Sequence, residues 1–369
     1  MKIKNQKLII LLNIFLSYVY IVLIKCSDKR YFNRRQNNNN IGKRIGIIAY
    51  HNDNNIGNQL LKYSMNFFLK KIGFNPVLVS LEELKNVNID FLKKYLEIKE
   101  IKNYYTDLNQ SDFDFLIVNS DQVWAYNYKR IFEVGFLSFA KNWNITKIVY
   151  AASLAYGNWI LSKKSINFAK ELVKQFSGIS LREQNSIELI NRYLGIKPIL
   201  VLDPTFLIDK NDYLEIIKDF NIEIDINKEY LCSYILDKSF HKKAYIKKVI
   251  SELKYKLITI RIGIKDFIQK FIFSINICKS IITDSYHGTV FSIIFNKPFI
   301  TFINTKRGNV RFFSLKNIFK LDNRFIYPNR IKSIDIQMLR KNPNINKTNF
   351  NILKKRSIQF LKENLGLSG

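Results

Sequence analysis

Cysteine and histidine are both scarce in this sequence, with three residues of each among 369. Cys26, Cys232 and Cys278 are far apart and odd in number, so they predict neither a disulfide framework nor a metal cluster. The three histidines also lack the spacing of metal ligands. We therefore expect a protein of a reducing compartment with no metal site.

Acidic residues are few as well, because 30 Asp and Glu oppose 59 Lys and Arg, and the formal net charge is +29. A charge of this size attracts anions. The lysines are scattered, however, and the sequence has no zinc-finger spacing, RNP motif or helix-turn-helix signature. We expect no nucleic-acid partner. An anionic small molecule or a membrane surface accounts for the charge more simply.

One long apolar run occurs near the N-terminus, at residues 8–24 (LIILLNIFLSYVYIVLI). Its length is at the short limit for a helix that spans a bilayer. No small-residue cleavage site follows it, so we expect a retained hydrophobic helix, with a polar linker completing residues 1–40. Cations after the run favour a cytoplasmic protein anchored at the inner face of the membrane. The alternative is a helix that packs on the rest of the protein.

From residue 41 onward, short apolar runs alternate with segments of helical periodicity, which is the pattern of an α/β protein. The chain length favours two domains. We therefore predict two facing, doubly wound, Rossmann-like domains, at 41–215 and 216–369, preceded by the hydrophobic helix. The amphipathic segment 349–366 predicts a final helix that can return to brace the first domain.

Small polar residues follow the predicted strands of the first domain. Because the carboxyl ends of parallel strands meet at one edge of a sheet, and ligands bind there in open sheets, we expect these residues to converge on a cleft. They are Asn55, Gly57, Asn58, Ser120, Asp121 and Gln122, with Ser153 and Asp203 after two further strands.

In the second domain, the segment KSIITDSYHGTV (279–290) predicts a strand that passes directly into a helix. His287 lies at this turn. The start of a helix offers free N–H groups to phosphate or carboxylate, and Gly288 and Thr289 let an anion approach the backbone. A neutral imidazole at this place can donate or accept a proton. The alternative is a structural histidine that is hydrogen-bonded to Asp284 or to a carbonyl group.

Four segments in this order resemble the polysaccharide pyruvyl transferase family. The resemblance spans residues 44–325 and implies two facing Rossmann-like domains of the GT-B-like type. It also implies transfer of pyruvate from phosphoenolpyruvate to a sugar hydroxyl, which forms a ketal on a surface polysaccharide or its lipid-linked precursor, with no cofactor. The segments are NNIGNQLLKYSMNFFLKKIGF, VNSDQVW, FSGISLREQNSIELI with VLDPTFL, and ITDSYHGTVFSIIFNKPFI.

The resemblance implies that His287 is the general acid or base. Arg182 would bind a carboxylate or phosphate in bidentate fashion, although an ion pair with Glu183 or another neighbour explains it equally well. Arg311 is a further anion-binding candidate. The remaining substrate-binding candidates are Asn55, Gly57 and Asn58, which a helix cap also explains, the possible sugar-binding residues Ser120, Asp121 and Gln122, and Ser285, Gly288 and Thr289 of the histidine motif.

Ser285 departs from the pattern of the better-known members, which carry arginine two positions before the histidine. The Ser-Tyr-His-Gly sequence therefore suggests a divergent branch, in which Arg261, Arg311 or a lysine replaces the lost cation. Two other hypotheses stay open. The protein could transfer a sugar from a nucleotide sugar on the same scaffold, or it could be a non-catalytic protein of polysaccharide assembly.

Overall fold

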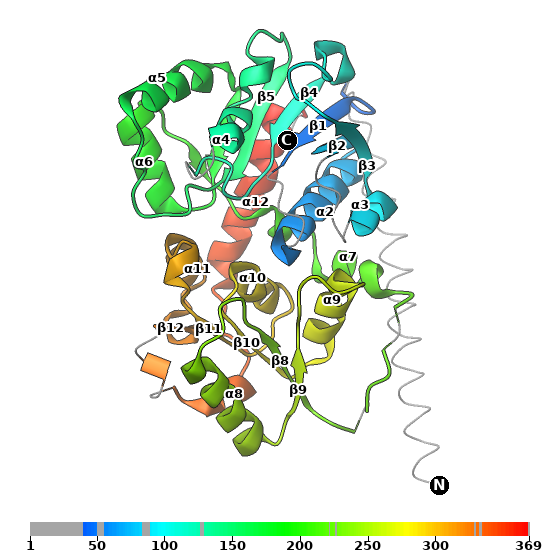
Figure 1. Cartoon of the computed structure of the whole chain (residues 1–369), viewed down its shortest axis with the longest axis vertical. Helices are drawn as coiled ribbons and strands as arrows, with labels where there is room; N and C mark the ends of the chain where they lie inside the picture. The colour runs from blue at the N-terminus through cyan, green and yellow to red at the C-terminus, as the bar shows by residue number, and fades with distance from the viewer. Residues whose placement is uncertain are drawn as a thin grey trace. The chain divides into compact units, whose positions relative to one another are not determined.

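A computed structural model of the chain describes residues 40–49, 55–82, 89–125, 129–220, 222–225, 227–327, 330–331 and 334–367 (Figure 1). Residues 40–367 form one compact unit. The apolar segment 8–24 lies outside the described residues, and so does its predicted contact with a membrane. Within the described ranges, no helix combines the length and the apolar character that crossing a membrane requires.

The first half of the compact unit is built on a sheet of seven parallel strands. Four of these strands carry the apolar runs seen in the sequence. The last strand is shorter than expected, because the backbone N–H of Leu202 donates to Oγ of Ser357 and not to a neighbouring strand. In sheet order the strands are β3 (Glu97–Ile101), β2 (Asn75–Leu81), β1 (Arg44–Ile48), β4 (Phe115–Val118), β5 (Thr146–Ala152), β6 (Gly178–Leu181) and β7 (Ile199–Leu200).

Helices cover both faces of this sheet, as the doubly wound prediction requires (Figure 1). One face packs against α4 (Lys129–Gly135), α5 (Lys163–Leu172) and α6 (Gln184–Leu194). The other face packs against α2 (Ile56–Lys71), α3 (Ile89–Tyr95) and α12 (Lys347–Asn364). The short helix α7 (Lys210–Leu214) follows the sheet in the chain.

The second half is built on a sheet of five parallel strands. In sheet order they are β12 (Phe325–Ile326), β11 (Phe299–Phe302), β10 (Ser280–Thr283), β8 (Tyr230–Tyr234) and β9 (Lys256–Thr259). Helix α8 (Phe240–Leu253) covers one face, and α9 (Phe267–Ile277), α10 (Tyr286–Ile294) and α11 (Val310–Phe319) contribute to the core on the other face. The fold is therefore α/β with two Rossmann-like sheets, as predicted.

The final helix α12 belongs to the second half in sequence but packs on the first sheet. The Oγ of Ser357 accepts a hydrogen bond from the backbone N–H of Leu202 at 2.9 Å, and Phe360 lies against Tyr150 with ring centroids 6.2 Å apart. Helix α12 therefore returns to the first domain, as the sequence predicted. The domain boundary between residues 215 and 216 stays a prediction, because the two halves form one compact unit.

Each sheet has one point at which the order of its strands reverses direction. In the first sheet β1 lies between β2 and β4, and in the second sheet β8 lies between β9 and β10, so successive connections leave in opposite directions at β1 and at β8. Ligands of open α/β sheets bind at the carboxyl ends of the strands beside such a reversal point. The segments that follow β1, β4, β8 and β10 are therefore the expected place for the site.

Candidate functional site

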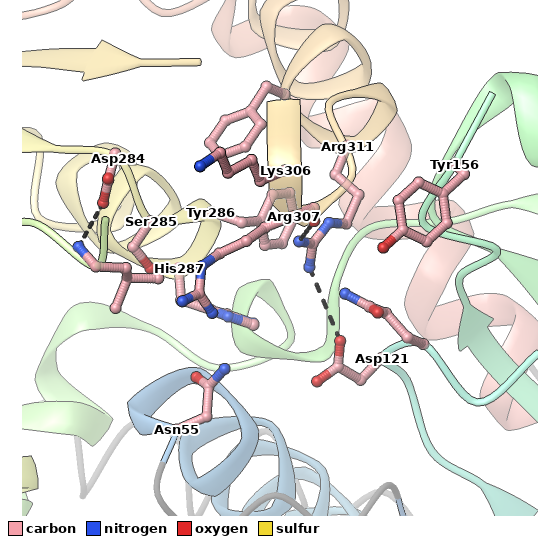
Figure 2. A pocket seen from close by; sticks show the side chains of 13 residues that line it. Asn55, Asp121, Tyr156, Asp284, Ser285, Tyr286, His287, Lys306, Arg307 and Arg311 are labelled. Carbon is pink, nitrogen blue, oxygen red and sulfur yellow. Dashed lines mark hydrogen bonds and ion pairs between the residues drawn. The ribbon is translucent and has the colours of Figure 1, made fainter. Parts of the chain in front are cut away.

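A polar pocket of about 180 Å³ lies where the carboxyl ends of the two sheets meet (Figure 2). Figure 2 shows Asn55 and Asp121 from the first half below His287, Arg307 and Arg311 from the second half. The 13 lining residues are Asn55, Asp121, Gln122, Tyr156, Leu236, Asp284, Ser285, Tyr286, His287, Lys306, Arg307, Arg311 and Phe312.

His287 is held in the first turn of α10 and is only 4 % exposed. Among the described residues, its buried Nε2 has no hydrogen-bond partner, and Oδ2 of Asp203 lies 3.8 Å away. Burial lowers the pKa of His287 to about 4, and this effect outweighs the opposing influence of Asp203 and Asp121. The imidazole is therefore neutral near pH 7 and able to accept a proton.

Gly57 lets the start of α2 lie directly against His287. A Cβ atom at this position would overlap Nδ1 and neighbouring atoms of the His287 ring. Asn55 caps the helix, with its Oδ1 accepting from the Gly57 N–H at 2.9 Å, and it also lines the pocket. Gly57 itself is not a lining residue, so its role is to permit this close approach.

Arg182 lies beneath the pocket and not in its wall. It is 2 % exposed, and its guanidinium group donates to Asp203 at 2.7 Å, to Asp121 at 3.1 Å and to Glu183 at 3.2 Å. These carboxylates raise the pKa of Arg182, although burial acts in the opposite direction. Arg182 therefore forms ion pairs with Glu183 and its other neighbours, as the structural alternative stated, and its guanidinium group already has acceptors within the protein. Asp203 lies between Arg182 and His287.

Asp121 connects the buried cluster to the pocket surface. Burial alone would raise the pKa of its carboxyl group, but Arg182 and the neighbouring cations lower it, so Asp121 is ionised. Asn58, buried beside it, donates from Nδ2 to Oδ2 of Asp121 at 3.3 Å. The backbone of Asp121 has a φ of 92°, a strained conformation that is typical of functional sites. Asn58 therefore positions Asp121 and does not line the pocket.

Ser120 and Gln122 flank Asp121 and differ in their surroundings. Ser120 is buried, and its Oγ donates to the carbonyl oxygen of Ala151 at 2.6 Å and accepts from Arg182 at 3.3 Å. Gln122 lines the pocket. Of the three predicted sugar-binding residues after β4, two therefore reach the pocket and one supports the Arg182 cluster.

Three cations reach the pocket from the segment after β11. Arg311 is 7 % exposed, lies 5.2 Å from the ring centroid of Tyr286, and has Nη1 3.9 Å from Asp121. Arg307 donates from Nε and Nη2 to both carboxylate oxygens of Asp237, at 2.8 and 3.0 Å. Lys306 is the third. Arg311 was predicted from the sequence, whereas Lys306 and Arg307 were not.

The other residues of the histidine motif have mainly structural contacts. Ser285 caps α10, with its Oγ accepting from the Gly288 N–H at 3.3 Å, and it also lines the pocket. Gly288 permits close contact with Thr283, and Thr289 shares a hydrogen bond with Thr301 at 2.8 Å. Neither Gly288 nor Thr289 lines the pocket.

Asp284 does not bind His287, in contrast to the structural alternative considered for the histidine. Its carboxylate accepts from the backbone N–H groups of Leu236 and Asp237 at 2.6 and 3.0 Å, and from Nζ of Lys242 at 2.7 Å. Asp284 thus ties the end of β10 to the turn after β8. This leaves the Nε2 of His287 without a partner.

Four of the pocket residues that sequence analysis missed share one signal. Tyr156 follows β5, Leu236 follows β8, and Lys306 and Arg307 follow β11, so these four occur just beyond strand ends. Applying the strand-end rule to every strand would have found them, but not Phe312, which lies within α11. Tyr286 was part of the quoted motif but had no assigned role, and burial raises the pKa of its hydroxyl well above the usual value. Arg261 lines a different surface, described below.

Across the described ranges, no group of three or more His, Cys, Asp or Glu residues is arranged to hold a metal ion. Cys232 and Cys278 are both buried free thiols beneath the second sheet.

Comparison with solved structures shows that the chain has a two-domain fold of the GT-B type. UGT89C1 of Arabidopsis thaliana matches with a TM-score of 0.54 and 9 % identity over 88 % of this chain and 100 % of that one. The S. aureus MnaA–UDP structure matches with a TM-score of 0.53 and 11 % identity over 88 % and 98 %. A putative UDP-N-acetylglucosamine 2-epimerase of Listeria monocytogenes gives 0.54 and 9 % over 85 % and 91 %. At these identities the likeness shows the fold alone.

The sequence itself identifies the family. No curated protein matches the chain significantly. The family model described as polysaccharide pyruvyl transferase, however, matches residues 55–306, which include the start of α2, the Arg182 cluster and the histidine motif. The chain therefore belongs to the polysaccharide pyruvyl transferase family, a family of transferases.

Proposed function

We propose that this protein transfers a pyruvyl group from phosphoenolpyruvate to a sugar hydroxyl during biosynthesis of a surface polysaccharide. The observation that carries the proposal is the Nε2 of His287, which is buried beside a small pocket with three cations and has no partner in the part of the chain that the structure describes. A neutral histidine in this setting is suited to proton transfer. The family match supports the reaction class.

In the proposed reaction His287 moves the proton of an attacking hydroxyl group. The first hydroxyl oxygen bonds to C2 of phosphoenolpyruvate, His287 takes the hydroxyl proton, and C3 gains a proton to become a methyl group. The second hydroxyl oxygen then bonds to C2 while the C2–O bond to phosphate breaks. Of the two hydroxyl protons, one is retained in the methyl group and the other leaves with inorganic phosphate.

The donor is assigned from charge and size. Phosphoenolpyruvate carries a phosphate and a carboxylate, and Lys306, Arg307 and Arg311 can pair with both. These residues supply positive charge that is missing at position 285, where this chain has serine in place of the family's arginine. The pocket volume of about 180 Å³ lies below the range of roughly 300–1,000 Å³ that is typical of drug-sized ligands. This favours a three-carbon donor over a nucleotide sugar.

The acceptor is assigned to the first half of the pocket. Asn55, Asp121 and Gln122 offer amide and carboxylate groups that suit sugar hydroxyls. The acceptor is a saccharide or a lipid-linked saccharide. A lipid-linked acceptor fits the expectation of a cytoplasmic protein that contacts the membrane through residues 8–24. The proposed chemistry needs no metal or cofactor, because phosphoenolpyruvate is itself the activated donor substrate.

The test is phosphate release from phosphoenolpyruvate in the presence of a panel of saccharide acceptors. We expect acceptor-dependent release by the full chain and a loss of about 10²–10⁴-fold in His287→Gln, the usual contribution of a general acid or base. His241→Gln is the matched control, since His241 is exposed on α8. Acceptor-dependent release that persists in His287→Gln would contradict the role of His287. No release, together with thermal stabilisation by a nucleotide sugar, would contradict the choice of donor.

A further inference from the structure

A second cavity, larger than the first, lies between α8 and β9 at the free edge of the second sheet. Its volume is about 550 Å³, and we call it the edge groove. Its floor is aliphatic and includes Ile246 and Ile250 of α8 and Leu257 of β9, with Ile262 just beyond the strand. Leu257 and Ile262 remain 42 % and 48 % exposed. Exposed apolar side chains gathered in a concave site indicate a ligand or partner.

The rim of the edge groove is cationic. Lys238, Lys243, Lys247 and Arg261 line it, and no acidic residue does. Within the described part of the chain, none of these four side chains has a hydrogen bond or ion pair with another residue. Four unpaired cations around an aliphatic floor are complementary to a ligand that is both anionic and apolar.

The edge groove adjoins the polar pocket. Leu236 lines both cavities. Lys242, at the inner end of the groove, donates from Nζ to Asp284, which lines the pocket. The two cavities therefore adjoin at Leu236, on the side of the second sheet.

We propose that the edge groove binds a single-chain anionic amphiphile, with its apolar chain on the floor and a phosphate group among the rim cations. Burial of a hydrocarbon chain on the aliphatic floor is favourable because it removes apolar surface from water, whereas the floor has no group that binds an anion. The rim cations can form charge-assisted hydrogen bonds with the phosphate group. This inference is independent of the donor in the pocket, because it concerns a different set of residues.

The experiment measures the dissociation constant of farnesyl phosphate for the full chain, with farnesol and inorganic phosphate as separate probes. We expect farnesyl phosphate to bind at least about tenfold more tightly than either, because only it carries both groups. Lys243→Glu with Lys247→Glu should weaken its binding about tenfold or more, since the two side chains lie one helical turn apart on the rim. No donor substrate is needed, so the result does not depend on phosphate-release activity.

The matched control is Lys170→Glu with Lys174→Glu, two exposed lysines with the same spacing in the first half. It changes the net charge equally and should leave farnesyl phosphate binding unchanged. Thr259→Trp keeps every rim cation but fills the groove from β9, and should weaken farnesyl phosphate while sparing inorganic phosphate. Equal loss in the two charge-reversal variants would overturn the proposal. So would equal affinity for inorganic phosphate, or tighter binding of the two-chain lipid dihexanoyl phosphatidylglycerol.

Discussion

The two halves of the pocket use their charges differently. On the first-sheet side, Arg182 is enclosed by three carboxylates, and every side chain of that cluster is at most 8 % exposed. On the second-sheet side, Arg307 pairs with Asp237, and the two side chains are 48 % and 34 % exposed. Buried clusters of opposite charge hold a fold in one geometry, whereas partly solvated cations remain available to a ligand.

This difference separates stability from binding. Changes on the first-sheet side should reduce the free energy of unfolding, because they leave buried charges without partners. Loss of the partly exposed Arg307 on the second-sheet side should affect substrate affinity and leave the fold nearly unchanged. His287 and Gly57 lie where the halves touch, so changes there should affect both properties.

The largest effect is expected for Arg182→Met. Removal of the guanidinium group leaves Asp121, Glu183 and Asp203 buried without their shared cation, which should lower the free energy of unfolding by about 3–5 kcal/mol. Urea denaturation measures this change. Lys93→Met, which removes an exposed ion pair with Glu100, is the control and should have little effect. A stability loss no larger than that of the control would show that the cluster does not hold the first half together.

Gly57→Ala tests the contact between the halves. The added methyl group would overlap the His287 ring, so the ring or α2 must move, at a cost of about 1–3 kcal/mol. We also expect a loss of acceptor-dependent phosphate release, because His287 would leave its position. Gly157→Ala is the control, since its added Cβ would meet only Val310 at 3.7 Å. Full activity in Gly57→Ala would mean that the position of His287 is not set by this contact.

The pH dependence of stability tests whether His287 is neutral in the fold. Its pKa is about 4 when folded, against 6.5 for an ordinary histidine, so the unfolded chain binds a proton more readily between these values. Stability is therefore fully present above pH 6.5 and is lost as pH falls toward 4. Between pH 7 and pH 5 the loss from this residue should be about 2 kcal/mol.

His287→Gln should remove that part of the pH dependence. Denaturation at pH 7 and pH 5 measures it, and His241→Gln should behave as the unmodified protein does. An identical loss of stability in His287→Gln would show that other groups, such as the buried carboxylates, cause the whole effect.

The smallest effect is expected for Arg307→Gln, on the second-sheet side. Loss of one partly exposed cation should raise the KM for phosphoenolpyruvate about tenfold, with kcat and stability little changed. Arg356→Gln, on the exposed face of α12, is the control. A large fall in unfolding free energy in Arg307→Gln would contradict the contrast between the buried Arg182 cluster, which stabilises the fold, and the partly exposed Arg307, which is available to a ligand.

Much of the fold could be predicted from the sequence because its signals are local. The apolar run before Asp284 and the glycine after His287 predicted the strand and helix that became β10 and α10. Short strands were harder, and β3, β6 and β12 went unassigned. The polar strand Glu97–Ile101 lies at a sheet edge, where half of its surface meets water and no apolar run is needed.

The sequence predicted which residues belong to the site better than it predicted which of them pair with each other. His287, Asn55, Asp121, Gln122, Ser285 and Arg311 all line the pocket. Arg182, Gly57, Asn58, Ser120, Gly288 and Thr289 instead support it from below, which sequence spacing cannot distinguish. Whether a polar side chain faces a cavity or a buried partner depends on which strand ends lie next to each other.

By itself, the sequence determined the α/β pattern, the histidine motif and the family, because periodicity and short motifs are properties of neighbouring residues. Tertiary structure alone decided that Arg182 pairs with three carboxylates, that Arg307 lines the same pocket as Ser285, and that an edge groove adjoins the pocket. The physical reason is strand order. Placing β1 beside β4, and β8 beside β10, brings together residues that are far apart in the sequence, such as Asn58 and Asp121, and only their packing sets which charges are paired and which stay free.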